Sequence, residues 1–487
     1  MNFYMIFNVL GWVCKFEAVF LLFPGLVGLI YNEKTGVAFL LAAIICGLVG
    51  FVLGFFKPKN KNLYARDGFA IVSFSWILIS LFGALPFILR VDPVNMPQVS
   101  FINAFFESAS GFTTTGATIF DDLEILPQCI LFWRSLTHWI GGVGVLVFIM
   151  AFLPLSGAGN MNMMKAESTG PNVGKFVPKV RTTAIIMCSM YFGLTIIEMI
   201  CLLIARMPFF DALTTSFSTA GTGGFALHNE SIAYYQSPAI EIIVGIFMLL
   251  FSFNFGFYFL LIAKKFKSAF TMSEIIVFLG IVGVSVGFCT ANIMATHVYD
   301  NFGDGLRNSF FTISSLMSST GFVTVDYSIW PMFSKVIIIL VMFIGACAGS
   351  TGGGIKVSRI IIMSKSMVKE LQAQAHPNMV TRVTMDGREV SKETIKSVTN
   401  YLCAFVIVFI VSLIIVSLNE FDFATSFTSV TATLNNTGPI CGIDLGPTNS
   451  YNSFSVLSKS VFIFDMIAGR LELYPILVLF TNTLWRK

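Results

Sequence analysis

Threonine, serine and glycine recur in four short windows of this sequence, and the oxygen atoms of such residues are suited to coordinating a cation. The windows are FINAFFESASGFTTTG (101–116), PFFDALTTSFSTAGTG (208–223), LRNSFFTISSLMSSTG (306–321) and FATSFTSVTATLNNTG (423–438). Each window ends on a Thr-Gly pair, and the closing glycines follow one another at intervals of 107, 98 and 117 residues. The candidate ligands are the last three residues of each window: Thr114, Thr115, Gly116, Gly221, Thr222, Gly223, Ser319, Thr320, Gly321, Asn436, Thr437 and Gly438.

The chemistry expected of these windows is the replacement of an ion's water shell by backbone carbonyl oxygens. Glycine adopts backbone conformations that a Cβ atom would close, and the threonine hydroxyl supplies a further acceptor oxygen. Four such segments of one chain can meet around an axis and present rings of oxygen atoms. The alternative is four ordinary Thr-Gly turns. A single window would favour that alternative, whereas the fourfold repetition favours a common site.

The elements that must position these windows are membrane spans. The chain of 487 residues is 55% hydrophobic and 11% charged, with a mean hydropathy of +0.81, whereas soluble proteins carry about 25% charged residues. Because about 20 apolar residues cross a bilayer as a helix, the sequence predicts ten spans. They cover residues 7–31, 37–56, 68–90, 129–154, 182–206, 238–263, 273–297, 333–363, 396–418 and 455–483. The first has no basic start and no cleavage site, so we expect a retained span.

The charged residues predict the orientation of these spans. Basic residues gather in four connections, at 57–66, 165–181, 264–267 and 356–396, while the connections between them are acidic. Since basic connections stay in the cytoplasm, ten spans place both termini there. The acidic outer side would raise the local concentration of cations.

The remaining side chains disfavour enzyme chemistry. The nine cysteines include no CxxC pair and mostly fall within spans, as small buried hydrophobic residues do. The four histidines, His138, His228, His297 and His376, have no metal-ligand spacing. The sequence shows no convergent nucleophile and base, and its largest polar connection, about 364–395, is too short for a catalytic domain. We therefore expect no enzyme and no nucleic-acid partner. An intramembrane enzyme stays open as a rival hypothesis, which activity without ion flux in liposomes would support.

Two spans and one window recur as a unit that divides the chain. Each repeat should contain a span, a short re-entrant helix, a polar tip and a second span, because non-helical backbone at membrane depth must be buried or line a water-filled cavity. The predicted parts are 1–66, with two N-terminal spans, and repeats at 67–165, 166–268, 269–370 and 371–487.

The eighth span is interrupted by GACAGSTGGG at 345–354. Each glycine costs a helix about 1 kcal/mol relative to alanine, so a broken helix at the pore is predicted. The alternative is a helix-packing face of small residues. The residues concerned are Gly345, Ala346, Gly349, Ser350, Thr351, Gly352, Gly353 and Gly354.

A single arginine, Arg470, interrupts the tenth span in FIFDMIAGRLELYPILVLF. A charge at membrane depth is costly and usually faces a cavity or a partner. Arg470 could therefore face a pore, or it could form a structural ion pair with Asp465 or Glu472. Both interpretations can hold together.

The sequence resembles the Trk/Ktr/HKT family of potassium transporters over nearly its whole length, and most closely the TrkH subfamily. The resemblance rests on the window glycines and on LFWRSLTHWIGGVGVLV (131–147), GACAGSTGGGIKVSR (345–359), TLNNTGP (433–439) and AGRLEL (468–473). It implies an all-α polytopic membrane protein in which four span–pore-loop–span repeats surround a pseudo-fourfold pore. The two additional N-terminal spans, within 7–56, are similar to those of the TrkH subfamily and not to the shorter Ktr subunits.

The resemblance implies potassium uptake across a bacterial inner membrane through a channel-like pore, with K⁺ as the transported ion and no organic cofactor in this chain. Gly116 stands where some plant relatives that prefer sodium carry serine. Residues 345–354 are then an intramembrane gating loop under the filter, and Arg470 opposes cation passage below it. The implied partners are a second copy of the chain, a cytosolic TrkA-type ring that binds nucleotides, and membrane lipid. A symporter that couples K⁺ to Na⁺ or H⁺ is the alternative.

Overall fold

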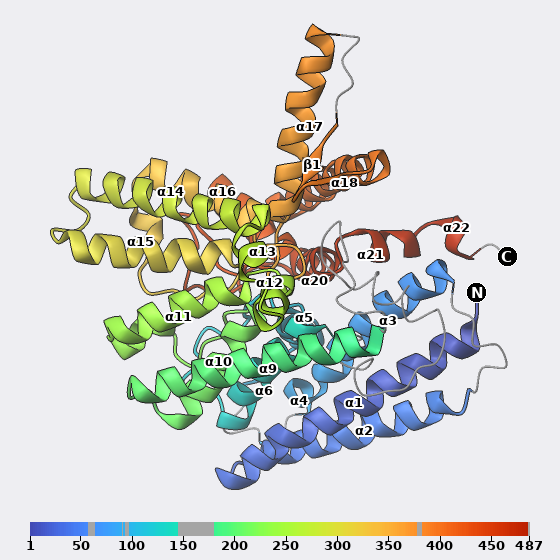
Figure 1. The fold of residues 1–487 in the computed structure, drawn as a ribbon. Coiled ribbons are helices and arrows are strands. Elements are labelled where there is room, and N and C mark those ends of the chain that lie inside the picture. The colour runs from blue at the N-terminus through green and yellow to red at the C-terminus, as the bar shows by residue number, and fades with distance from the viewer. Residues whose placement is uncertain (57–63, 90, 93–96, 145–179, 377–381, 486–487) are drawn as a thin grey trace.

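In the part of the chain that the structure describes, the fold is helical apart from one short pair of strands. The computed structural model describes residues 1–487 other than 57–63, 90, 93–96, 145–179, 377–381 and 486–487 (Figure 1). Strands β1 (Thr384–Met385) and β2 (Arg388–Glu389) pair antiparallel in a hairpin that follows helix α17 (Val357–Ala375). The expected all-α class is confirmed.

Two N-terminal helices form an antiparallel hairpin on one flank of the molecule (Figure 1). They are α1 (Phe3–Ile30) and α2 (Gly36–Gly54). The carboxylate of Glu33, in the turn between them, accepts a hydrogen bond of 2.7 Å from the backbone N–H of Gln128. Because Gln128 is the first residue of α6 (Gln128–Val143), the turn caps that helix and joins the hairpin to the rest of the protein.

The remaining helices repeat one order of elements four times: a long helix, a short helix, an extended segment and a further helix. We call these repeats units one to four. Unit one contains α3 (Ala65–Gly83), α4 (Leu85–Ile88), α5 (Phe101–Phe112) and α6. Unit two contains α9 (Val180–Ile204), α10 (Phe209–Gly221), η1 (Ser231–Tyr235), α11 (Pro238–Phe251), α12 (Phe255–Ile262) and α13 (Phe266–Phe270).

Units three and four follow the same order. Unit three contains α14 (Ser273–Ala295), α15 (Phe302–Met317), η2 (Tyr327–Ile329), α16 (Met332–Ile344) and α17. Unit four contains α18 (Lys392–Val416), η3 (Ser417–Asn419), α19 (Phe423–Leu434), α20 (Val456–Arg470), α21 (Tyr474–Leu479) and α22 (Asn482–Trp485).

The short helices α5, α10, α15 and α19 are largely buried although they are rich in serine and threonine. Several of their hydroxyl groups donate to carbonyls one turn back: Thr113, the C-cap residue of α5, to Ala109 at 2.7 Å, and Thr431 to Phe427 at 2.8 Å. Such local bonds satisfy the hydroxyl donors without any partner outside the helix. The short helices can therefore lie inside the bundle and present their C-terminal ends to its centre.

Six of the described helices are long and apolar enough to cross a membrane, or seven if the bent pair α11–α12 counts as one span. They are α1, α2, α3 with α4, α9, α14 and α18. The predicted span 129–154 corresponds to α6 as far as Val143, and its residues 145–154 lie outside the described residues. Most of the basic residues predicted to mark the connections 57–66 and 165–181 lie outside them as well.

Three predicted spans are broken. Span 238–263 bends by 90° between α11 and α12. In span 333–363, α16 ends at Ile344 and α17 begins at Val357, so the predicted break at the glycine-rich segment is confirmed. In span 455–483, α20 ends at Arg470 and Glu472 and Leu473 have positive φ angles of 55° and 65°. Neither this break nor the bend between α11 and α12 was predicted from the sequence.

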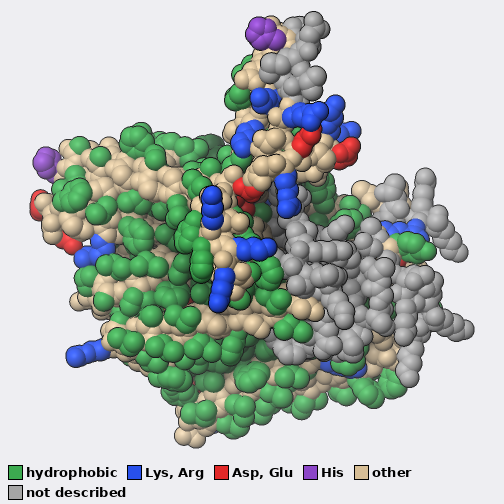
Figure 2. All heavy atoms as spheres, viewed as in Figure 1, with side chains coloured by type: hydrophobic (Ala, Val, Ile, Leu, Met, Phe, Trp, Pro, Cys, Tyr) green, Lys and Arg blue, Asp and Glu red, His purple; other side chains and the backbone are tan. Residues whose placement is uncertain are grey.

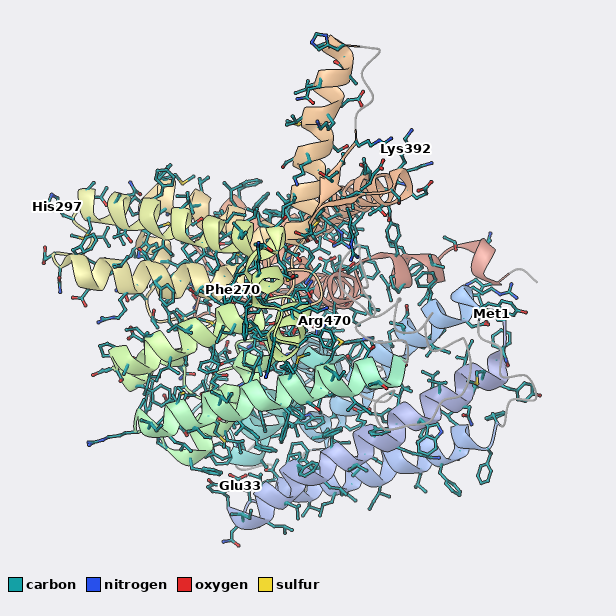
Figure 3. All side chains as sticks on the ribbon, in the orientation of Figure 1. Met1, Glu33, Phe270, His297, Lys392 and Arg470 are labelled. Carbon is teal, nitrogen blue, oxygen red and sulfur yellow. The ribbon has the colours of Figure 1, made fainter. Side chains whose placement is uncertain are left out.

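The outer faces of the helices carry many apolar side chains (Figure 2). On α2, for example, Leu41, Ile44 and Leu48 are 43%, 59% and 61% exposed, as expected of a lipid-facing surface. Figure 3 places Met1 and Lys392 toward one end of the long helices and His297 toward the other, with Arg470 between them. Helix α17 projects away from the body of the molecule (Figure 1).

Candidate ion-conduction site

The extended segment after each short helix has the same backbone conformation in all four units. A residue in the left-handed region is followed, two positions later, by a glycine with positive φ. The left-handed residues are Thr114 (φ 55°), Thr222 (54°), Ser319 (59°) and Asn436 (53°), and the glycines are Gly116 (80°), Gly224 (76°), Gly321 (86°) and Gly438 (91°). Glycine adopts this region at little steric cost, which explains the residue type at the second position.

In the structure, the second window aligns with the other three one residue later than it does when the windows are aligned on their Thr-Gly pairs. That comparison pairs Gly223 with Gly116, but the φ angles pair Gly224 with it. The segment of unit two is therefore 222–224, and Gly221 is the last residue of α10. Gly224 was not predicted as a site residue because the Thr-Gly pair at 222–223 matches the pairs that end the other windows. The sequence does contain a signal: because residues 223 and 224 are both glycines, either could be aligned with Gly116.

The four glycines take part in a closed ring of contacts. A Cβ atom added to any of them would overlap a backbone carbonyl oxygen of the next unit. The pairs, glycine first, are Gly116 with Gly223, Gly224 with Thr320, Gly321 with Thr437 and Gly438 with Thr115. The contacts run from unit one through units two, three and four and back to unit one. Units one and three therefore lie across the ring from each other, and so do units two and four.

We call the four extended segments, 114–116, 222–224, 319–321 and 436–438, the ring segments. Polar side chains hold these ring segments against each other. Thr113 Oγ1 and Thr115 Oγ1 are 2.8 Å apart within unit one. The Asn436 amide of unit four donates to Thr115 Oγ1 at 2.9 Å and to the Met466 carbonyl at 2.8 Å. Within the described part of the chain, the hydroxyl of Thr437 is buried without a protein partner, so its oxygen is free to accept a ligand.

His138 explains why unit two has a glycine, Gly223, where the other units have threonine before the ring glycine. A Cβ atom on Gly223 would overlap the imidazole ring of His138. His138 is held in place by a contact of 2.7 Å from Nδ1 to the Gly111 carbonyl and by stacking on Phe225, with ring centres 4.2 Å apart. The histidine therefore fills the space of the missing side chain, a packing role that its position in the sequence did not reveal.

The glycine-rich loop 345–354 packs against the ring segments of units three and four. The backbone N–H of Gly353 donates to the Ser319 hydroxyl at 2.5 Å, and that of Gly354 donates to the Asn435 carbonyl at 3.1 Å. A Cβ atom on Gly353 would overlap the same Asn435 oxygen. Since the loop is not helical, the alternative of a continuous packing helix is wrong. All of the predicted loop residues, from Gly345 to Gly354, lie in this segment.

The other side of the loop is attached to unit two and to α14. The N–H of Cys347 donates to the Ser252 carbonyl at 3.1 Å, and the N–H of Phe255 donates to the Gly349 carbonyl at 3.0 Å. Both bonds use the backbone groups that the bend between α11 and α12 leaves free. The buried carboxylate of Glu274 accepts a further bond of 2.6 Å from the N–H of Ala348. The loop thus connects three units.

Arg470 joins this loop to unit one. Its Nη1 donates to the Thr351 carbonyl at 2.6 Å, and its Nη2 donates to the carbonyls of Gly141 at 2.5 Å and Gly142 at 3.1 Å. Thr351 belongs to unit three and the two glycines to unit one, which lie across the ring from each other. A side chain from unit four that reaches both must cross the space next to the ring.

The two carboxylates predicted as possible ion-pair partners of Arg470, Asp465 and Glu472, contact other side chains in the structure. Asp465 accepts a hydrogen bond of 2.8 Å from Ser412, and its pairing with Arg470 is not found among the described residues. Glu472 forms a salt bridge with Arg359. Lys356, which was not predicted from the sequence, is a second cation at the loop: it is 2% exposed and donates to the Gly352 carbonyl. Two positive groups therefore contact the loop.

A helical bundle with apolar outer faces, a central ring of glycine contacts and an arginine beside that ring defines a class: multi-pass membrane proteins that transport ions. The comparisons with known proteins agree with this class. The family model TrkH, described as a cation transport protein, matches residues 35–487. The chain therefore belongs to the TrkH family of cation transport proteins, which are transporters and not enzymes.

Similar proteins match the chain over all or nearly all of its length. The Trk system potassium uptake protein TrkH of Salmonella typhimurium is 37% identical over 490 residues, with 100% of each chain covered. The Trk system potassium uptake protein TrkG of Escherichia coli strain K12 is 33% identical and covers 99% of this chain. The crystal structure of the potassium transporter TrkH from Vibrio parahaemolyticus matches with a TM-score of 0.90 at 32% identity, over 100% of both chains.

Proposed function

We propose that this chain takes up potassium across the bacterial inner membrane through a pseudo-fourfold pore centred on the four ring glycines. The observation that carries the proposal is the closed ring of contacts, in which each glycine meets a carbonyl of the next unit. Rings of carbonyl oxygens can replace the hydration shell of K⁺. The names of the relatives and of the matched crystal structure, which refer to potassium, support the same ion.

The proposed ligands are mainly backbone oxygens of the ring segments, with the threonine hydroxyls as further candidates. The residues are Thr114, Thr115 and Gly116, Thr222, Gly223 and Gly224, Ser319, Thr320 and Gly321, and Asn436, Thr437 and Gly438. No residue of this set carries a charge, so selection among cations of equal charge must come from the number and spacing of the oxygens.

The loop and Arg470 form the proposed gate. The bonds of the loop to Ser319 and Asn435 hold it next to the ring, and the guanidinium of Arg470 lies between units one and three. Two unit charges 4 Å apart repel by about 4 kcal/mol at an effective dielectric constant of 20, so a cation cannot pass Arg470 easily. Each neutral hydrogen bond of the loop contributes only about 1 kcal/mol, so a partner protein can move it.

The cytoplasmic side is proposed to be the end of the molecule that carries both termini, by the positive-inside rule. A homodimer would use helix α17, which projects from the body and carries the exposed apolar residues Met367, Val368 and Leu371 (Figure 1). The exposed lysines 264, 265 and 267 around α13 are candidates for docking a cytosolic TrkA-type ring that binds nucleotides.

The membrane potential supplies the proposed driving force. It contributes about 2.3 kcal/mol per charge per 100 mV, which concentrates K⁺ inside a cell with a negative interior. The second candidate function is a symporter that couples K⁺ to Na⁺ or H⁺. The observation that favours this candidate is the buried carboxyl group of Glu198, whose two oxygens have no hydrogen-bond partner among the described residues. Such a group could bind and release a proton during transport.

Growth of a potassium-uptake-deficient bacterium at low external K⁺ tests the proposal. The full chain, expressed with a TrkA-type partner, should restore growth, and Gly224→Ala should abolish the rescue because its Cβ would overlap the Thr320 carbonyl. Gly280→Ala is the matched control, since a Cβ at Gly280 in α14 has nothing within 4 Å. Rescue by the Gly224 variant, or no rescue by membrane-inserted wild-type protein, would contradict the proposal.

A further inference from the structure

A buried ion pair lies behind the junction of units one and two. Arg134 in α6 and Glu107 in α5 are 2% and 1% exposed, and Arg134 Nε lies 2.7 Å from Glu107 Oε1. Burying a charge is costly unless a partner neutralises it and hydrogen bonds satisfy both groups. Arg134 belongs to the motif LFWRSLTHWIGGVGVLV, for which the proposed function gives no role.

Glu107 holds the segment that leaves the ring in unit one. Its Oε2 accepts a hydrogen bond of 2.9 Å from the N–H of Ile119. The Thr118 hydroxyl lies 3.0 Å and 3.1 Å from its two oxygens. Thr118 and Ile119 follow Gly116 by two and three positions. Hydrogen bonds to a carboxylate are about twice as strong as neutral ones, so this segment is firmly fixed.

Arg134 holds the equivalent segment of unit two. Its Nη1 donates to the Ala226 carbonyl at 3.1 Å, its Nη2 donates to the Thr118 hydroxyl at 3.3 Å, and its guanidinium carbon lies 4.1 Å from the centre of the Phe225 ring. Ala226 follows Gly224 by two positions. The planar fork of arginine can bond in several directions at once, and here it spans both outgoing segments where Gly116 meets Gly223.

This arrangement is specific to one junction of the four. The residue nine positions before the ring glycine is Glu107 in unit one, but it is Thr215, Thr312 and Ser429 in units two, three and four. The ring therefore has a charge-assisted support between units one and two, whereas the sequence offers a hydroxyl group at the corresponding place elsewhere.

We propose that Glu107 and Arg134 are positioning residues that fix the spacing of the ring segments between units one and two, and that this spacing favours K⁺ over the smaller Na⁺. A smaller ion is bound well only when its oxygen ligands move inward. A guanidinium bonded to Glu107, Thr118 and Ala226 together resists that movement, because closing the ring would break these bonds. The inference rests on the proposed function, since it assumes that the ring binds K⁺.

The decisive variant is Arg134→Lys in the full chain, reconstituted with its partner ring in proteoliposomes. Lysine keeps the positive charge beside Glu107 but cannot donate in the fixed fork geometry to Ala226 and Thr118 as well. We expect the K⁺/Na⁺ permeability ratio to fall by about fivefold, the factor for the loss of about one hydrogen bond. The matched control is Arg307→Lys, at an ion pair with Glu241 of 2.8 Å that does not bond to the ring segments. It should leave the ratio unchanged.

A second variant tests the same inference in case the Arg134→Lys protein does not fold. The double change Glu107→Gln and Arg134→Gln removes both charges together, so no buried charge is left unpaired, and it should also lower the K⁺/Na⁺ ratio. A ratio within about twofold of wild type in either folded variant would overturn the inference, since about 0.4 kcal/mol is below one hydrogen bond. Loss of folded protein in both variants would show a purely structural role and overturn it too. A wild-type protein without K⁺ preference would instead contradict the proposed function.

Discussion

The guanidinium of Arg470 lies 2.6 Å from the carbonyl oxygen of Thr351, although the two residues are 119 positions apart and belong to different units. This bond links the arginine to the loop that packs against the ring. The two parts of the proposed gate are therefore connected, and a movement of one requires a movement of the other.

Replacing Arg470 by alanine should increase K⁺ flux into proteoliposomes. The change removes a positive charge next to the ring and the bond that holds Thr351, and a barrier lowered by about 1.4 kcal/mol raises a rate about tenfold. Flux is measured per amount of folded protein, with Arg307→Ala as a control arginine outside this region. A fall in flux that is restored by adding Glu472→Gln would show instead that Arg470 serves an ion pair.

Deleting Ala346 to Gly349 should raise the flux that does not depend on the partner ring. The shortened segment loses the bonds of Cys347, Ala348 and Gly349 to Ser252, Glu274 and Phe255. It is then no longer attached to unit two and α14, and it is too short to fill the pore. Flux is compared with and without the partner ring. If a membrane-inserted deletion variant stays fully dependent on the partner, the loop is not the obstruction.

Gly116→Ser should weaken the preference for K⁺ over Na⁺. The serine Cβ would overlap the Gly223 carbonyl and require a positive φ that only glycine adopts at little cost. The segments must then separate, and the hydroxyl adds a competing oxygen. Permeability ratios are measured beside Gly280→Ser as the control. An unchanged ratio would make Gly116 an ordinary turn residue.

The register of unit two can be tested with two glycine-to-alanine variants, each made with and without His138→Ala. Gly223→Ala should lose K⁺ flux because its Cβ meets the His138 ring, and His138→Ala should restore much of that flux by making room. Gly224→Ala should not be restored in this way, because it meets the backbone of Thr320 at a φ of 76°. Equal rescue of both variants would contradict the assignment of Gly224 to the ring.

Local sequence was sufficient for the windows and for the break at 345–354, because glycine, serine and threonine have strong backbone preferences of their own. It was not sufficient for the register of unit two, where the positive φ of Gly224 identifies the equivalent of Gly116 and the space beside Gly223 is filled by His138. The partners of Arg470 were also missed. Backbone carbonyls of Gly141 and Thr351 carry no sequence signal, and both are brought to Arg470 only by the packing of three units.

The Glu107–Arg134 pair was missed for a related reason. Both residues lie in stretches that predict buried helices, and the sequence does not show that a turn of chain from unit two passes within reach of Arg134. The bond to the Ala226 carbonyl, 92 residues away, exists only in the folded protein. The segments of the site could therefore be predicted from the sequence, but not the side chains that we propose set their spacing.

The reversal potential of purified protein in a planar bilayer tests the central claim most directly. With the partner ring present, a K⁺ gradient and opposing Na⁺ and H⁺ gradients are imposed together. A potassium-conducting ring predicts a potential close to the K⁺ equilibrium value that does not move when the Na⁺ or H⁺ gradient is changed. A potential that follows either of these gradients would contradict a pure K⁺ pore and favour the symporter.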